Sequence, residues 1–78
     1  MIGVKFYSAA MRAAKIRKAK GLSQSELAER VGVEQPKISR FERGSDGITL
    51  GLVREIARAL EVSLSDLFAE DRSETEQA

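Results

Sequence analysis

Two helix-length stretches lie next to each other between residues 22 and 44, in the segment LSQSELAERVGVEQPKISRFERG, with only a few residues between them. Ser23 and Glu26 have the spacing of a capping box, in which each side chain accepts a hydrogen bond from the other residue's backbone N–H. This spacing predicts a helix over residues 24 to about 30. Gly32 then ends the helix, because glycine readily adopts the left-handed conformation that turns a chain sharply.

Pro36 locates the second helix of the pair. Proline fits only in the first turn of a helix, since deeper inside it would remove a backbone hydrogen bond and clash with the preceding turn. A helix is therefore expected from Gln35 to Arg43. Two short helices joined by such a tight turn form a helix-turn-helix, in which the first crosses the DNA backbone and the second enters the major groove. The positions expected to pack inward are apolar or small: Leu27, Ala28, Val31, Val33, Ile38 and Phe41.

Three further helices are expected around this pair. Ser8 can cap a helix rich in alanine and basic residues, which Gly21 would end. Thr49 can cap a helix that reaches Leu60. Ser63 begins what resembles a second capping box, before the short stretch LSDLF.

One domain is expected, over residues 8–69. Residues 1–7 alternate apolar side chains with small or polar ones, and we interpret them as an N-terminal arm or a short strand. Residues 70–78 are polar and acidic, and they are expected to form a disordered tail.

The composition argues against several classes of function. None of the 78 residues is cysteine or histidine, so thiolate ligands, disulfides and the commonest general base are all missing. No arrangement of carboxylates and lysines replaces them, so we expect no enzyme, no metal site and no cofactor. The sequence shows no signal-peptide pattern and no apolar run near the roughly 20 residues that cross a bilayer. A cytoplasmic protein without a membrane partner is therefore expected.

The net charge of +1 hides an uneven distribution. Residues 1–43 hold ten Lys/Arg against four Asp/Glu, whereas residues 44–78 hold three against eight. Such a split can orient a domain with its basic part towards a polyanion. A mixed solvated surface is the alternative, and the charge split alone favours neither interpretation strongly.

Three segments together resemble the Cro and phage-repressor (XRE-type) helix-turn-helix family: IRKAKGLSQSELAERVGV, ISRFERG and TLGLVREIARALEVSLSDLF. They lie in the family's order and spacing between about Ile16 and Phe68, which is far more specific than a lone helix-turn-helix pattern. The resemblance implies an all-α fold, a compact five-helix bundle of the lambda-repressor-like type with the helix-turn-helix at its second and third helices. It also implies a homodimer that binds double-stranded operator DNA.

The outer face of the second helix of the pair carries the candidates for base contact. If Ile38 and Phe41 point inward, Gln35 and Arg40 lie on the opposite face. Glutamine can pair through two hydrogen bonds with adenine and arginine with guanine, and each such pair discriminates by roughly 1 to 3 kcal/mol. An ordinary solvated helix face is the alternative, which the helix-turn-helix pattern disfavours. The full set of base-contact candidates is Gln35, Pro36, Lys37, Ser39 and Arg40.

Other residues are expected to bind the DNA backbone or to support the fold. Gln24 matches the glutamine with which the family begins its second helix, where the amide and the helix N-terminus meet a phosphate. Arg17 and Glu42 occupy the positions of a family ion pair, whose role is expected to be architectural. The phosphate-contact candidates, for which free solvation is the alternative, are Gln24, Lys18, Lys20 and Arg43.

Glu34 departs from the family pattern, since it stands where a serine or threonine usually caps the third helix. A carboxylate there complements the helix dipole but would lie close to phosphates. Accepting a hydrogen bond from cytosine N4 is the alternative role.

Three classes of function remain open. The leading hypothesis is a transcriptional regulator, a repressor or autoregulator, that acts by blocking RNA polymerase or contacting it. An antitoxin that neutralises a toxin, or a restriction-modification controller protein, fits the loop FERGSDGITL as well. RNA binding is less favoured, because few aromatic side chains are present to stack on bases. The candidates for a homodimer surface, which alternatively complete the core of one chain, are Leu50, Leu64, Leu67 and Phe68.

Overall fold

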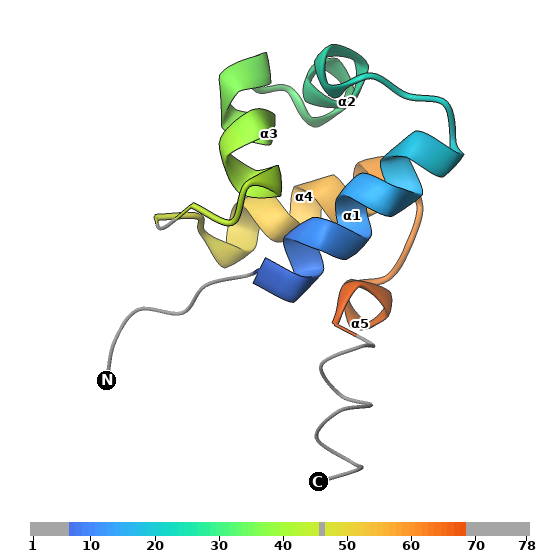
Figure 1. Cartoon of the computed structure of the whole chain (residues 1–78), viewed down its shortest axis with the longest axis vertical. Helices are drawn as coiled ribbons and strands as arrows, with labels where there is room; N and C mark the ends of the chain where they lie inside the picture. Colours follow the sequence, from blue (N-terminus) through green and yellow to red (C-terminus); the bar gives the residue numbers. More distant parts are fainter. Residues whose placement is uncertain (1–6, 46, 69–78) are drawn as a thin grey trace, which may run out of the picture.

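Five α-helices make up the part of the chain that the computed structural model describes, residues 7–45 and 47–68 (Figure 1). They are α1 (Tyr7–Ala19), α2 (Gln24–Val31), α3 (Gln35–Glu42), α4 (Leu50–Leu60) and α5 (Leu64–Leu67). The described residues contain no strand, in agreement with the expected all-α class. Apart from Tyr7, the expected N-terminal arm lies outside the described residues, and so does the expected acidic tail.

The turn between α2 and α3 has the backbone that its sequence predicts. Ser23 Oγ accepts from the backbone N–H of Glu26 at 3.0 Å, and Glu26 Oε1 accepts from that of Ser23 at 2.8 Å, which completes the capping box. Gly32 follows α2 with φ at 89°, a left-handed conformation that strains any other side chain. Pro36 lies in the first turn of α3, where its missing N–H has no intrahelical partner to lose.

The starts of the other helices agree only in part with expectation. α1 begins at Tyr7, so Ser8 lies inside its first turn and does not precede the helix as a cap. Thr49 does cap α4, because its Oγ1 accepts from the backbone N–H of Leu52 at 3.1 Å. Glu34 precedes α3 without a side-chain hydrogen bond to it, so only its charge complements the positive end of that helix.

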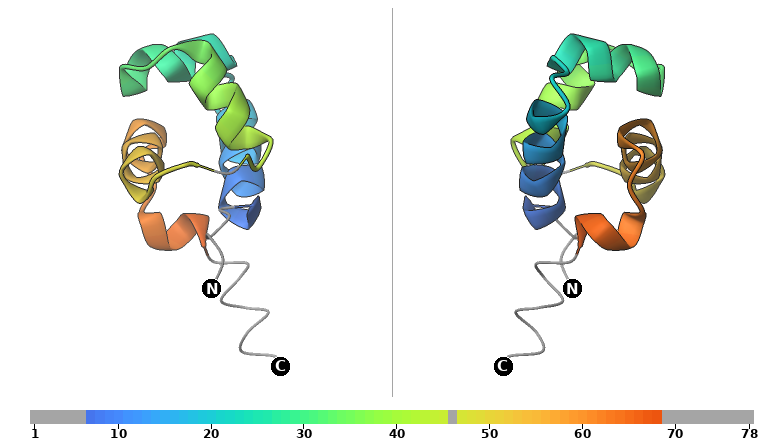
Figure 2. Two further views of the ribbon diagram at one scale, coloured as in Figure 1. Left: turned by 90° about the vertical axis from the view of Figure 1, so that its left-hand side faces the viewer. Right: turned by 90° about the vertical axis from the view of Figure 1, so that its right-hand side faces the viewer.

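The core lies between α1 and α4, with α2 and α3 across one end and α5 at the other (Figure 2). α1 supplies small residues to it, so its neighbours approach closely, whereas the other helices supply large side chains. Burying each large apolar side chain stabilises the fold by about 1.5 to 3 kcal/mol. The largest fully buried side chains are Leu27, Ile38, Phe41, Val53, Ile56, Leu60 and Leu67.

Polar contacts hold the short α5 in place. Ser63 and Asp66 form the second capping box, with Ser63 Oγ accepting from the backbone N–H of Asp66 at 3.0 Å. Arg12 of α1 donates from Nε to the backbone oxygen of Asp66 at 2.8 Å. This bond ties the two helices at the end of the bundle opposite α3.

Over residues 7–45 and 47–68, no helix is long and apolar enough to cross a membrane.

Candidate nucleic-acid interface

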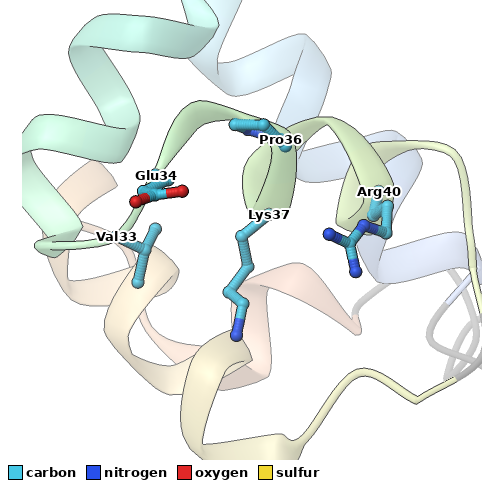
Figure 3. Close-up of a pocket in the computed structure, with 5 residues that line it drawn as sticks. All are labelled: Val33, Glu34, Pro36, Lys37 and Arg40. Atoms are coloured by element: carbon cyan, nitrogen blue, oxygen red, sulfur yellow. The ribbon is translucent and has the colours of Figure 1, made fainter.

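α3 is anchored by its inner face and presents a basic outer face. Ile38 is fully buried and Phe41 is 1% exposed, whereas Pro36, Lys37 and Arg40 are exposed. Figure 3 shows these three side chains projecting from α3. Each is one of the base-contact candidates, and the periodicity of the helix brings them together. Their contact with bases remains a prediction.

A hollow adjoins this face and was not anticipated from the sequence. Lys37 and Arg40 border it on α3, while the loop before α4 and the first turn of α4 form the far side. Thr49, the N-cap of α4, is among its lining residues, so the start of α4 faces the same hollow as the two cations. The sequence indicated that Thr49 caps a helix. Only the fold shows that residues 47–49 and 52 line the same hollow as residues of α3. The other lining residues are Val33, Gly47, Ile48 and Leu52.

Arg17 and Glu42 form the expected ion pair between α1 and α3. Arg17 Nε donates to Glu42 Oε2 at 2.7 Å and Nη2 donates to Oε1 at 3.0 Å, a two-pronged arrangement. The two side chains are 9% and 7% exposed. Arg17 Nη1 donates to the backbone oxygen of Leu22 at 2.7 Å, so the guanidinium also holds the chain just before α2.

The ion pair continues outward through two glutamines. Gln24 Nε2 donates to Glu42 Oε1 at 3.0 Å, and Gln35 Nε2 donates to Gln24 Oε1 at 2.7 Å. Gln35 and Gln24 are both half-buried, so the expectation that both amides simply face DNA was incomplete. An amide has two N–H donors and one oxygen with two lone pairs, so these bonds leave Gln35 one N–H and its oxygen for a ligand.

The other basic candidates occupy different surroundings. Arg43 Nη1 donates to Ser39 Oγ at 3.1 Å, so these two residues act as a pair one turn apart on α3. Arg43 is exposed and Ser39 is half-buried. Lys18 and Lys20 are exposed at the C-terminal end of α1. The structure does not bring the two lysines onto α3, and their contact with phosphate remains a prediction.

The four candidates for a homodimer surface differ in exposure. Leu67 is fully buried in the core of the single chain, so its side chain is not available to a second copy. Leu64 and Phe68 are half-buried and pack against that core. Leu50, at the start of α4, is 43% exposed. Among the four, Leu50 is therefore the side chain best placed to meet a partner.

Glu26 is the titratable side chain whose environment the capping box changes most clearly. The backbone N–H of Ser23, followed by the Ser23 side chain and the charge of Arg30, holds the pKa of Glu26 below its ordinary value of 4.5. The carboxylate is thus the form that the capping box favours.

The sequence of the chain is similar to those of known helix-turn-helix proteins. A helix-turn-helix family model, HTH_3, matches residues 14–67. Antitoxin HipB of Escherichia coli K12 is 40% identical over 50 residues, which are 64% of this chain and 57% of that protein. The chain thus spans little more than half the length of this antitoxin.

Solved structures agree with the five-helix fold. The restriction-modification controller protein C.AhdI of Aeromonas hydrophila superposes with a TM-score of 0.74 at 32% identity, covering 81% of this chain and 91% of that one. The controller protein C.Esp1396I, in a structure bound to a 19 base pair DNA duplex, gives a TM-score of 0.74 at 31% identity and covers 83% of this chain and 87% of its own. The fold is therefore the lambda-repressor-like bundle expected from the sequence.

Proposed function

Because the chain belongs to the HTH_3 helix-turn-helix family of DNA-binding transcription regulators, we propose that it represses or autoregulates transcription by binding a palindromic operator as a homodimer. The observation that carries the proposal is the outer face of α3. Pro36, Lys37 and Arg40 project from it, while Ile38 and Phe41 fix the helix to the core. A helix held in this way can enter a major groove without rearrangement.

Each exposed group on α3 has a partner in the groove. Arg40 can donate two hydrogen bonds to O6 and N7 of guanine, and the Pro36 ring can contact a thymine methyl group. Gln35 presents one N–H and one oxygen, the pattern complementary to adenine. Lys37 and Ser39 complete the base-contacting set.

Residues of α1, α2 and the end of α3 bind phosphates of the DNA backbone. Arg43, Lys18 and Lys20 are exposed cations, and Gln24 lies at the N-terminus of α2, where backbone N–H groups favour an anion. These contacts fix the register of the protein on the duplex without reading its sequence. The resulting binding depends strongly on salt, because phosphate neutralisation releases counterions.

A homodimer would give the interface its symmetry. Leu50 supplies exposed apolar surface at the start of α4, and Leu64 of α5 and Phe68 after it add half-buried apolar side chains. In a two-fold dimer the two α3 helices lie roughly 34 Å apart and read two half-sites of one palindrome. Such a protein acts where the DNA is, in the cytoplasm, and regulates by excluding RNA polymerase or by contacting it. It needs no catalytic residue, metal or cofactor.

The decisive experiment is a binding selection from random DNA duplexes, repeated at two salt concentrations. A sequence-specific dimer enriches one palindromic site, and its affinity for that site exceeds that for random DNA by about a thousandfold or more. Enrichment of unrelated sequences, or of none, would overturn the proposal. The two salt concentrations report how much of the affinity comes from phosphates.

A second candidate is an antitoxin that also represses its own operon. The similarity to antitoxin HipB favours it, although the match covers only 57% of that protein. A toxin encoded beside the gene should then form a stable complex with this chain, measurable by copurification and calorimetry. Similarity to the controller protein C.AhdI favours instead a restriction-modification controller, which predicts a neighbouring endonuclease gene and no such complex.

A further inference from the structure

We propose that Glu42 is a positioning residue for base recognition: acting through Gln24, its carboxylate determines which way round the Gln35 amide faces the DNA, and so sets a preference for adenine. This inference rests on the proposed DNA-binding function. It gives a specificity role to a residue that the sequence indicated only as one half of a structural ion pair.

The direction of the chain of hydrogen bonds follows from the chemistry of the carboxylate. Glu42 in its ionised form can only accept hydrogen bonds, so Gln24 must turn its N–H2 group, and not its oxygen, towards it. The Gln24 Nε2 to Glu42 Oε1 distance is 3.0 Å. With its nitrogen held there, Gln24 points its oxygen at Gln35, which it meets at 2.7 Å from Gln35 Nε2.

The buried carboxylate of Glu42 therefore sets the orientation of the Gln35 amide, through Gln24. Gln35 donates one N–H to Gln24, which leaves its second N–H and its oxygen for DNA. A donor beside an acceptor matches adenine, which offers N7 as an acceptor and N6 as a donor. Were the amide reversed, its oxygen would face Gln24 and both N–H groups would face outward, which matches the two acceptors of guanine.

The start of this chain is rigid, which lets it act as a reference. Arg17 holds both oxygens of Glu42, at 2.7 and 3.0 Å, and the Glu42 side chain is only 7% exposed. Gln24 on α2 and Gln35 on α3 are both half-buried. Hydrogen bonds in such a low-dielectric setting reinforce one another, so an orientation set at one end persists to the other.

The informative variant is Glu42→Gln, which removes the charge and keeps the shape. Arg17 donates only, so the new side chain at position 42 turns its oxygen to Arg17 and its N–H2 group to Gln24. Gln24 then reverses, and Gln35 reverses with it. We expect the preference for adenine over guanine at the base pair read by Gln35 to fall by roughly tenfold, while affinity for random DNA stays constant.

Gln35→Ala first identifies the base pair that Gln35 reads, as the position at which this variant loses its preference. The experiment then measures dissociation constants for the selected operator and for an operator in which guanine replaces adenine at that position. Gln24→Met cuts the chain of bonds at its middle without touching the ion pair, and it should lower the same preference. Ile56→Val is the control, since it loosens the core from α4 without touching the Arg17–Glu42–Gln24–Gln35 chain of hydrogen bonds. It should lower stability and leave the preference intact.

The outcomes separate this inference from the function on which it rests. If the wild-type protein selects no sequence, the proposed function fails and the inference fails with it. If the wild type is selective and both Glu42→Gln and Gln24→Met keep its adenine preference, only the inference is overturned. An equal loss of preference in Ile56→Val would also overturn it, because general loosening of the fold would then explain the effect. If Glu42→Gln does not fold, the double variant Arg17→Met/Glu42→Met takes its place, since it removes both buried charges together, and an unchanged adenine preference in it would overturn the inference.

Discussion

Arg17 and Glu42 join α1 to α3 through two hydrogen bonds, Nε to Oε2 at 2.7 Å and Nη2 to Oε1 at 3.0 Å, with both side chains almost wholly removed from solvent. Removing one partner leaves the other as a buried charge without a counterion. We expect Glu42→Ala and Arg17→Ala each to lower the free energy of unfolding by about 3 to 5 kcal/mol. Urea denaturation followed by circular dichroism measures this, and an unchanged midpoint in both variants would contradict the burial of the pair.

Arg40→Ala should weaken operator binding and relax the preference at a single base pair. Arg40 is exposed, and if its guanidinium reads one guanine as proposed, its loss should cost about 1 to 3 kcal/mol on the operator and much less on random DNA. Titrations of both DNAs with the variant measure the two losses. Equal losses would show that Arg40 binds phosphate only.

Lys18→Ala is the matched comparison for a cation away from α3. Lys18 is exposed on α1, so its proposed phosphate contact carries no sequence information. Its removal should weaken binding to every duplex alike and reduce the slope of log affinity against log salt by about one. A change of preference at any base pair would contradict the assignment to phosphate.

The capping box makes stability depend on pH through Glu26. Because the fold lowers the pKa of Glu26 below 4.5, the carboxylate contributes stability that is fully present above the unfolded pKa and is lost as the pH falls through the folded pKa. Wild type and Glu26→Gln should therefore differ in stability at neutral pH and converge in acid. Melting temperatures between about pH 6 and pH 3 measure this convergence. A constant difference over that range would show that Glu26 acts through something other than its charge.

Glu61 ends α4 at φ 64°, the single non-glycine residue with a positive φ among those the structure describes. A left-handed conformation is unfavourable for a residue with a Cβ atom and costs glycine little. Glu61→Gly should therefore raise stability by about 0.5 to 1 kcal/mol, after the greater entropy of glycine in the unfolded chain is subtracted. Ala is the control at the same site, since it keeps the Cβ and should bring no gain.

Local signals were enough to predict most of the fold. The capping box of Ser23 and Glu26 joins residues three apart, and Gly32 and Pro36 act on the backbone next to them, so all four depend little on the rest of the molecule. The start of α1 was placed two residues late, because a serine favours a cap only when the chain before it leaves the helix.

The connections within the site depend on tertiary structure and were less accessible. Gln24 and Glu42 are 18 residues apart, and Gln24 and Gln35 are 11 apart. The sequence indicated each of these residues separately, as a phosphate contact, an ion-pair member and a base contact. Only the crossing of α2 and α3 shows that the three side chains form one chain of hydrogen bonds. The hollow beside Lys37 and Arg40 was missed for the same reason.

Leu50 and Met11 allow a controlled test of the dimer surface, because both are exposed, at 43% and 46%, and they lie on different helices. Leu50→Glu places a charge where the proposed partner chain packs, so sedimentation velocity should show a monomer at concentrations where the wild type is a dimer. Operator affinity should fall by about tenfold or more, since the second half-site is no longer held at high effective concentration. Met11→Glu should change neither quantity and should keep the wild-type melting temperature, because a surface substitution typically costs less than about 0.5 kcal/mol. Leu50→Glu should keep the helical circular dichroism of the wild type, while its melting temperature falls to that of a monomer. A Leu50→Glu protein that still sediments as a dimer would show that the two copies meet elsewhere.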